Sequence, residues 1–172
     1  MVATFLQDTL AKELERIFEG FLLQDPRGEW SKINIFCQGL PIPEVTEQID
    51  IPVEQLENGL AQEITREDPY PYIIVRIDDG EITDEASAQT VNTLLLAGVY
   101  DDGYDRQGAK DVLNIIAKIY ERFAKMPVLG GKYTVQYPIQ WTLQDEDTYP
   151  YYFGGMSIKW ETAAIRREDE YA

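Results

Sequence analysis

The spacing of the apolar residues changes several times along this chain of 172 residues, and this change constrains its fold. Two segments, about 4–21 and 107–125, place apolar residues at the i, i+3 and i+4 positions of a helix with one buried face. Segment 132–144 instead alternates apolar and polar residues, which is the pattern of a half-buried strand. We therefore expect helices and strands to share one hydrophobic core.

Shorter runs rich in β-forming residues predict the other strands. These runs are 32–40, 72–77, 87–100 and 153–163. A turn at Asp78-Asp79-Gly80 is expected to join the second run to the third. The resulting order predicts an α+β fold, with a mainly antiparallel sheet of about five strands and two principal helices packed on one face.

Several single residues carry local predictions. Thr4 and Asp105 are expected to cap the two helices, because their side chains can accept hydrogen bonds from the first turn. Pro138 has no N–H to donate, so it predicts an edge strand or a bulge within 132–144. The single cysteine, Cys37, is expected to pack in its strand as a small hydrophobic residue.

The chain has no histidine and one cysteine, which excludes a Ser-His-Asp triad, an internal disulfide and a zinc site built from these residues. The acidic segment after Tyr100 lacks the residue order of a calcium loop, and no glycine-rich phosphate loop occurs. Carboxylate pairs such as Asp101/Asp102 or Asp145/Asp147 suit acid–base chemistry, but such pairs are expected by chance among 31 acids. We therefore expect no catalytic residues, metal or cofactor, and no enzymatic activity.

With 31 acidic and 15 basic residues, the chain has a net charge of −16. A protein of this charge repels nucleic acid over most of its surface, so no specific nucleic-acid binding is expected. No apolar run approaches the roughly 20 residues that span a bilayer, and the N-terminus lacks the features of a signal peptide. We therefore expect no membrane partner and folding in a cytoplasm.

Residues 1–165 are predicted to form one domain, followed by a charged tail at 166–172. The least regular part, 41–68, is an acidic insertion or arm within this domain. Between Glu44 and Asp68 it carries eight acids and one base. Such a long connection is unusual in a compact domain, so it is either a solvated surface insertion or an arm that binds a partner.

The pattern Glu-Asp-x-Tyr-Pro-Tyr occurs twice, at 67–72 and 146–151. Each copy precedes a predicted strand, and the two strands are expected to run in the same direction. Their first residues then lie at the same end of the sheet, either as two aromatic-rich strand starts or as an interface with another subunit or partner. The candidate interface residues are Asp68, Tyr70, Tyr72, Asp147, Tyr149 and Tyr151.

The segment from Pro69 to Ile165 resembles the tail terminator proteins of long-tailed bacteriophages and related prophage tail particles. The opening helix and strand also suit that family. The resemblance rests on an ordered set of marks, which are "PYPYIIVRIDDGE", "LLLAGVYDDGYDRQGAKDVLNIIAKI" and "YPIQWTLQDEDTYPYYFGGMSIKWE".

The resemblance implies a structural virion protein without enzymatic activity. Such proteins form a ring, usually a hexamer, that caps the tail tube, ends its growth and joins the tail to the head connector. The implied partners are other copies of the chain, the tail tube protein and the head–tail connector protein, with sheath or a neighbouring subunit as an option for 41–68. The implied location is the tail or neck of a virion assembled in the bacterial cytoplasm.

The acidity of the chain adds a hypothesis about this ring, namely that carboxylates line its lumen and repel DNA. Two other functions stay open. One is another neck, head–tail connector or tail completion protein. The other, from a different class, is an acidic DNA mimic that inhibits an enzyme acting on nucleic acid.

Overall fold

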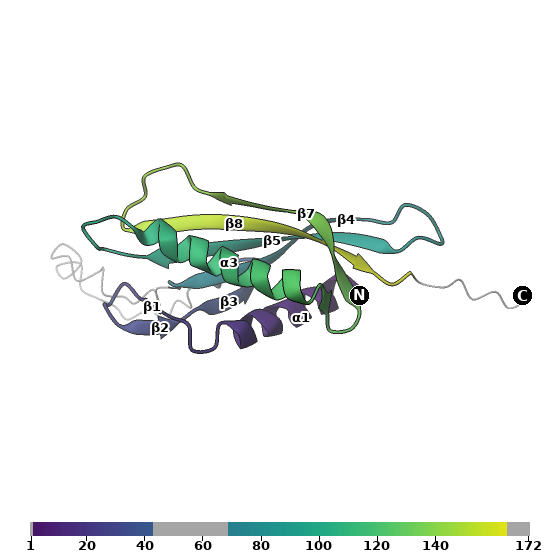
Figure 1. Cartoon of the computed structure of the whole chain (residues 1–172), viewed down its shortest axis with the longest axis horizontal. Coiled ribbons are helices and arrows are strands. Elements are labelled where there is room, and N and C mark those ends of the chain that lie inside the picture. The colour runs from purple at the N-terminus through teal and green to yellow at the C-terminus, as the bar shows by residue number, and fades with distance from the viewer. Residues whose placement is uncertain (1, 43–68, 165–172) are drawn as a thin grey trace, which may run out of the picture.

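The computed structural model describes residues 2–42 and 69–164, which form two helices and eight strands (Figure 1). The helices are α1 (Val2–Ile17) and α3 (Gly108–Lys125). The strands are β1 (Leu22–Gln24), β2 (Trp30–Lys32), β3 (Asn34–Cys37), β4 (Tyr72–Glu81), β5 (Gln89–Tyr100), β6 (Val128–Leu129), β7 (Tyr133–Leu143) and β8 (Tyr151–Thr162). Within the described ranges, neither helix offers an apolar stretch long enough to cross a membrane.

Six strands form one sheet in the order β3-β4-β5-β8-β7-β6, and β1 pairs with β2 in a separate hairpin. All neighbours in the large sheet are antiparallel except β3 and β4, which run parallel. The predicted α+β class and mainly antiparallel sheet are confirmed. The sheet has one strand more than expected, because the two-residue β6 is too short to leave a periodic pattern.

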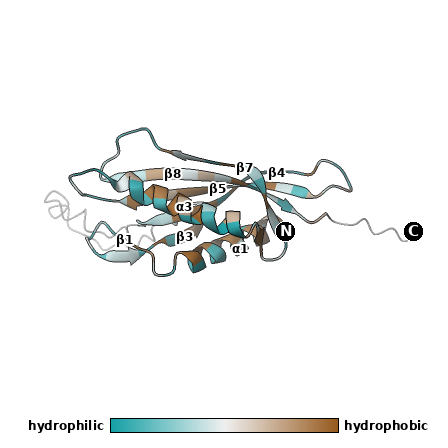
Figure 2. Cartoon of the chain, viewed as in Figure 1, coloured by the Kyte–Doolittle hydropathy of each residue, from teal (hydrophilic) through white to brown (hydrophobic). Residues whose placement is uncertain are grey.

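Both helices lie on the same face of the sheet, as predicted (Figure 1). Helix α1 packs against β3 and β4, and α3 packs against β5, β7 and β8. The apolar faces of the two helices supply much of the core, and the brown segments in Figure 2 follow this interface. Their fully buried side chains include Leu6, Leu10, Leu14, Ile115, Ile119 and Phe123.

Four local predictions need correction. Helix α1 begins at Val2, so Thr4 lies inside its first turn and is not its cap. The residue at the N-cap of α3 is Gln107, with no side-chain cap hydrogen bond, so Asp105 does not cap this helix. Strand β3 is shorter than predicted, and Cys37 at its end is exposed. Asp78-Asp79-Gly80 is not a turn, because β4 continues through it to Glu81.

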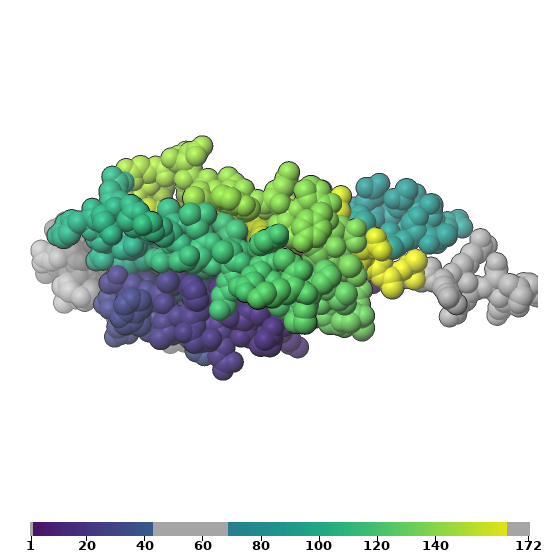
Figure 3. All heavy atoms as spheres, in the orientation of Figure 1, coloured from purple at the N-terminus to yellow at the C-terminus, as the bar shows by residue number. Residues whose placement is uncertain are grey.

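A register shift between Ile77 and Asp79 lets β4 accommodate this polar run and keep its pairing with β5. The two strands then continue together as a hairpin that projects from the body of the molecule (Figure 3). The prediction for Pro138 is confirmed, because the β7–β8 register shifts between Gln136 and Gln140.

A buried chain of polar groups joins β5 to β8 in the core. The indole N–H of Trp160 donates to Thr93 Oγ1 at 2.9 Å, and the Thr93 hydroxyl donates to the Ile158 carbonyl at 3.0 Å. Trp160 also packs edge-on against Phe123 of α3, with ring centroids 5.0 Å apart. Thr93 and Trp160 are both fully buried, so each hydrogen bond satisfies a group that water cannot reach.

We predict that Thr93→Val lowers the free energy of unfolding by about 1–3 kcal/mol, because it leaves the buried indole N–H of Trp160 without an acceptor. Thr93→Ser keeps the hydroxyl and is expected to cost less. Chemical denaturation of the two variants and the unchanged protein measures the difference. Equal costs for Val and Ser would show that the hydroxyl contributes nothing.

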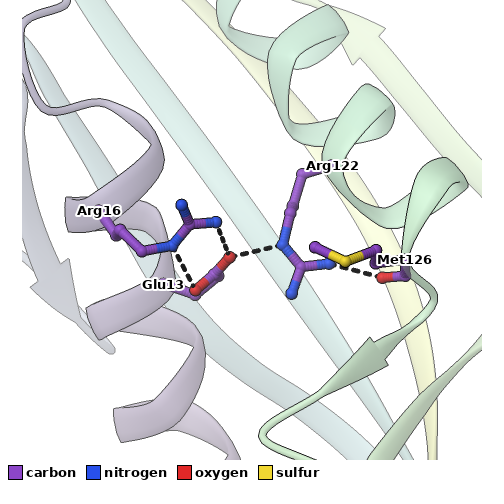
Figure 4. A network of polar contacts seen from close by, with 4 residues as sticks. All are labelled: Glu13, Arg16, Arg122 and Met126. Carbon is purple, nitrogen blue, oxygen red and sulfur yellow. Dashed lines mark hydrogen bonds and ion pairs between the residues drawn. The ribbon is translucent and has the colours of Figure 1, made fainter.

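A second polar group joins the two helices (Figure 4). The Glu13 carboxylate of α1 accepts hydrogen bonds from Arg16 of its own helix and from Arg122 of α3. Arg122 also donates to the carbonyl of Met126, just beyond the end of α3. The hydrogen bond from Arg16, together with that from Arg122, lowers the pKa of Glu13 against the opposing effect of burial.

We predict that Glu13→Gln destabilises the fold by about 1–3 kcal/mol at pH 7, because Arg122 loses its charged partner in a half-buried position. Since the pKa of Glu13 is lower in the folded than in the unfolded protein, this stabilisation is present above the unfolded pKa and is lost as pH falls through the folded pKa. The cost of Glu13→Gln should therefore shrink between pH 7 and pH 3.

Glu121→Gln provides the matched control, because the ion pair of Glu121 with Lys125 lies on the exposed surface of α3. Its melting temperature should differ little from that of the unchanged protein at either pH. Melting temperatures from circular dichroism measure both variants. A pH-independent cost for Glu13→Gln would contradict the assigned role of its carboxylate.

Candidate functional site

The two Glu-Asp-x-Tyr-Pro-Tyr copies meet at one end of the sheet, as the sequence predicted. Strands β4 and β8 both run antiparallel to β5, which lies between them, so they point in the same direction. Gly98 of β5 lies opposite Tyr72 on one side and opposite Phe153 on the other. The pairing of these strands therefore brings together two sequence segments 79 residues apart.

An aromatic cluster forms at this end of the sheet. Tyr70 is its centre, with ring centroids 4.7 Å from Tyr151, 5.1 Å from Tyr72 and 6.1 Å from Phe153. Tyr100, at the end of β5, packs against Tyr151 at 5.6 Å. The Tyr-Pro bonds before Pro71 and Pro150 are both cis, a feature that the sequence pattern did not predict.

Tyr72 fits into the space above Gly98. A Cβ atom on Gly98 would come within 2.5 Å of the Tyr72 ring, so the close approach depends on glycine. Tyr72 is buried, and this burial raises the pKa of its hydroxyl, while a hydrogen bond with Tyr70 acts in the opposite direction. The second tyrosine of the first copy is thus a packing residue of the sheet.

The remaining candidate residues lie apart from the cluster, in the loop before β8. Asp147 forms an ion pair with Arg106 of the loop before α3 and accepts a hydrogen bond from the backbone N–H of Tyr149. The hydrogen bond from Arg106 lowers the pKa of Asp147. Tyr149 donates its hydroxyl to the Asp102 carbonyl at 2.7 Å, and the Arg106 guanidinium lies 5.2 Å from the centre of its ring.

The structure therefore divides the predicted site into two parts. Tyr70, Tyr72 and Tyr151 form the aromatic cluster, whereas Asp147 and Tyr149 join two loops. Asp68 lies outside the described residues. Each described residue has partners within its own chain, and Tyr149 also keeps 41% of its surface exposed. Their role in contacts between subunits stays a prediction.

A second candidate surface, which the sequence analysis did not identify, lies between α3 and β7. It is a groove of about 620 Å³ beside the outer strands of the sheet. Three of its aromatic residues are strongly exposed, namely Tyr120 (48%), Tyr137 (61%) and Trp141 (56%). The sequence contains a signal for this groove, because Tyr137 and Trp141 lie on the apolar face of the alternating segment. In the structure α3 does not cover these two residues, so they stay exposed.

Comparison with models of known protein families and with the sequences of characterised proteins finds no match for this chain. Its function is therefore inferred from its residues, their geometry and the sequence resemblance described above.

We predict that Gly98→Ala destabilises the fold by about 1–3 kcal/mol, because the new methyl group overlaps the Tyr72 ring. Removing this ring relieves the overlap, so the cost of Gly98→Ala should be smaller in a Tyr72→Ala background. Denaturation of the two single variants and the double variant gives the coupling between the positions. Additive costs would show that the close contact is not the cause.

Proposed function

We propose that this protein is a structural component of a phage or phage-like tail. In this proposal it forms a ring at the end of the tail tube, ends tube growth and joins the tail to the head connector. The residues that carry the resemblance to tail terminators occupy the central elements of the fold, since they cover β4, β5, α3, β7 and β8. The size of the ring, a hexamer by resemblance, is part of the proposal.

One structural observation carries the proposal further, namely that the two faces of the sheet differ. Both helices lie on one face, and the other face has none among the described residues (Figure 1). On the helix-free face, β7 presents uncharged polar side chains, namely Thr134, Gln136, Gln140 and Thr142. The neighbouring β8 adds Ser157 and one pair of opposite charges, Lys159 and Glu161, to this face.

Such a sheet suits the wall of a ring. Helices need more room than strands, so a ring of these subunits is wider on the helix side, and the helix-free face points toward the lumen. This arrangement does not support a carboxylate-lined lumen, because Glu161 is the sole acidic residue in β7 and β8. With one basic and one acidic residue in β7 and β8 on this face, the surface offers DNA few charged partners, which suits a channel that DNA passes through.

We predict that the purified protein binds the ends of tail tubes assembled from the tube protein of the same source and stops their growth. Negative-stain electron microscopy with length measurements of growing tubes tests this. The expected result is a ring-shaped cap on one tube end and a shorter, narrower length distribution. Tubes that grow without change and carry no cap would contradict the proposal.

The same purified protein distinguishes the two alternative functions, which are another neck protein and a DNA mimic. Binding to isolated head connectors without binding to tubes would favour another position in the neck. Inhibition of an enzyme acting on DNA, without binding to either particle part, would favour the DNA mimic.

A further inference from the structure

The large sheet has two open edges on opposite sides of the molecule (Figure 1). Strand β3 is the last strand on one side, and its outer edge has no strand partner among the described residues. On the other side, β6 pairs only with Tyr133 and Thr134, so the rest of β7 has no strand partner beyond it within the described ranges. Both edges thus present backbone groups that have no partner strand within the described ranges.

The parts of the two open edges that matter here lack the charged residues that usually protect an edge strand. Natural proteins discourage edge-to-edge pairing with charged side chains, above all lysine, as well as with proline and bulges. Segment 34–37 and segment 139–144 contain no charged residue, in a chain of which 27% of residues are charged. Pro138 and the register shift protect the middle of β7 but leave its last residues regular.

Residues of the two open edges also lie at the same level along the strand direction. The strand pairings align Ile35 of β3, through Ile73, Ala97 and Gly154, with Leu143 of β7. They align Cys37 in the same way, through Val75, Leu95 and Met156, with Trp141. Strand β3 runs parallel to β4, and the directions then alternate through β5, β8 and β7, so β3 and β7 run antiparallel to each other.

The backbone orientation of these residues completes the match. The N–H groups of Asn34 and Gln38 donate to Pro71, just before β4, and to Val75 of β4, so the backbone groups of Ile35 and Cys37 between them point outward. The outward Cys37 carbonyl accepts a hydrogen bond from the N–H of Gly39 and keeps its second lone pair for a partner strand. The N–H of Gln144 donates to Phe153 of β8, so the backbone groups of Leu143 and Trp141 point away from β8. Each open edge therefore offers two outward residues with the same spacing.

We propose that β7 of one copy pairs antiparallel with β3 of a second copy, with Trp141 opposite Cys37 and Leu143 opposite Ile35 of the second copy. The two opposed positions form hydrogen-bonded pairs in which the N–H and C=O groups of both residues take part. This inference rests on the self-association in the proposed function and identifies the surfaces that carry it.

The side chains fit this pairing. Ile35 packs toward the core on the helix side of the sheet, which is also the side of Trp141 and Leu143. Pairing therefore places apolar side chains next to one another. It also brings α1 of the second copy toward the groove between α3 and β7, where Lys12 on the β3 side of α1 can lie against the exposed aromatic rings.

Charges at the ends of the two segments are complementary. Lys32, the last residue of β2, lies just before β3, and Glu146 lies in the loop just after β7. Continuing the proposed register beyond the paired residues brings Lys32 of the second copy toward Glu146. Both side chains are exposed, and neither has an ion pair within the described part of the chain. The interface joins two different edges, so it is heterologous, and repetition of it produces a closed ring or an open filament.

Charge reversal tests the register in the full-length protein. Lys32→Glu and Glu146→Lys should each weaken self-association about threefold to tenfold, and the double variant should restore it to within about twofold. Sedimentation velocity between 5 and 500 µM protein, at low salt, gives the dissociation constants. Single variants that associate like the unchanged protein, or a double variant that is not restored, would overturn the register.

Trp141→Asp tests the edge itself and should raise the dissociation constant at least about tenfold, a loss of about 1.4 kcal/mol. Ile82→Asp is the matched control, because Ile82 is also strongly exposed (65%) but lies at the tip of the β4–β5 hairpin. It should leave association unchanged. Equal effects of the two variants, or an unchanged protein that stays monomeric at every concentration, would overturn the inference.

A cross-link provides an independent test. Cys37 is the only cysteine, so Trp141→Cys creates a pair that can form a disulfide only between copies in the proposed arrangement. Hydrogen-bonded antiparallel pairs have Cα atoms about 5.5 Å apart, which lies within the range of a disulfide. Oxidation should give a ladder of linked subunits, and the control Gln140→Cys, on the other face of β7, should not.

The outcomes separate this inference from the proposed function. If the Trp141→Asp variant still forms rings on tube ends and the cysteine pair gives no cross-link, the proposed tail function stands and the edge pairing is wrong. If the protein forms a cross-linked oligomer that depends on Lys32 and Glu146 but does not bind tube ends, the edge pairing stands and the tail function is wrong.

Discussion

The pairing of β5 with β8 forms the centre of the large sheet. It runs without a break from Gln89 opposite Thr162 to Tyr100 opposite Tyr151. Its centre holds the buried chain of Trp160, Thr93 and Ile158, and α3 packs across both strands. A slip of one residue would turn Trp160 out of the core and place charged Lys159 in it, so the register has one acceptable value.

This register fixes the position of every other element of the sheet. At one end it brings Tyr70 against Tyr151, so the two Tyr-Pro-Tyr segments stabilise a single aromatic cluster. Across the sheet it places residues of the two open edges at the same level along the strand direction, although β3 and β7 are separated by three strands. The proposed pairing between copies therefore follows from contacts formed within one copy.

The sequence predicted those parts of the fold that depend on regular periodicity. Helix α3 and strands β5, β7 and β8 are long enough for their apolar spacing to identify them. The short strands β1, β2 and β6 were missed because two or three residues have no period. The turn at Asp78-Asp79-Gly80 was wrong because β4 absorbs this polar run through a register shift, which a local turn signal does not reveal.

The candidate site was predictable only in part. The repeated tyrosine pattern correctly indicated one end of the sheet, but it did not separate Tyr70 in the cluster from Tyr149, which faces Asp102 and Arg106. The groove beside β7 was missed for a different reason. Alternation shows that Tyr137 and Trp141 share a face with Val135, but only the position of α3 shows that Val135 is covered and the two aromatic residues are exposed.

Hydrogen exchange measured residue by residue, at protein concentrations below and above the onset of self-association, tests whether β7 of one copy pairs with β3 of the next. We expect the amide hydrogens of Ile35, Cys37, Trp141 and Leu143 to become protected on association, because these backbone groups point outward in the single copy. Phe36 and Thr142, which face strands of their own sheet, should change little. Association without new protection at the four outward residues would contradict the account.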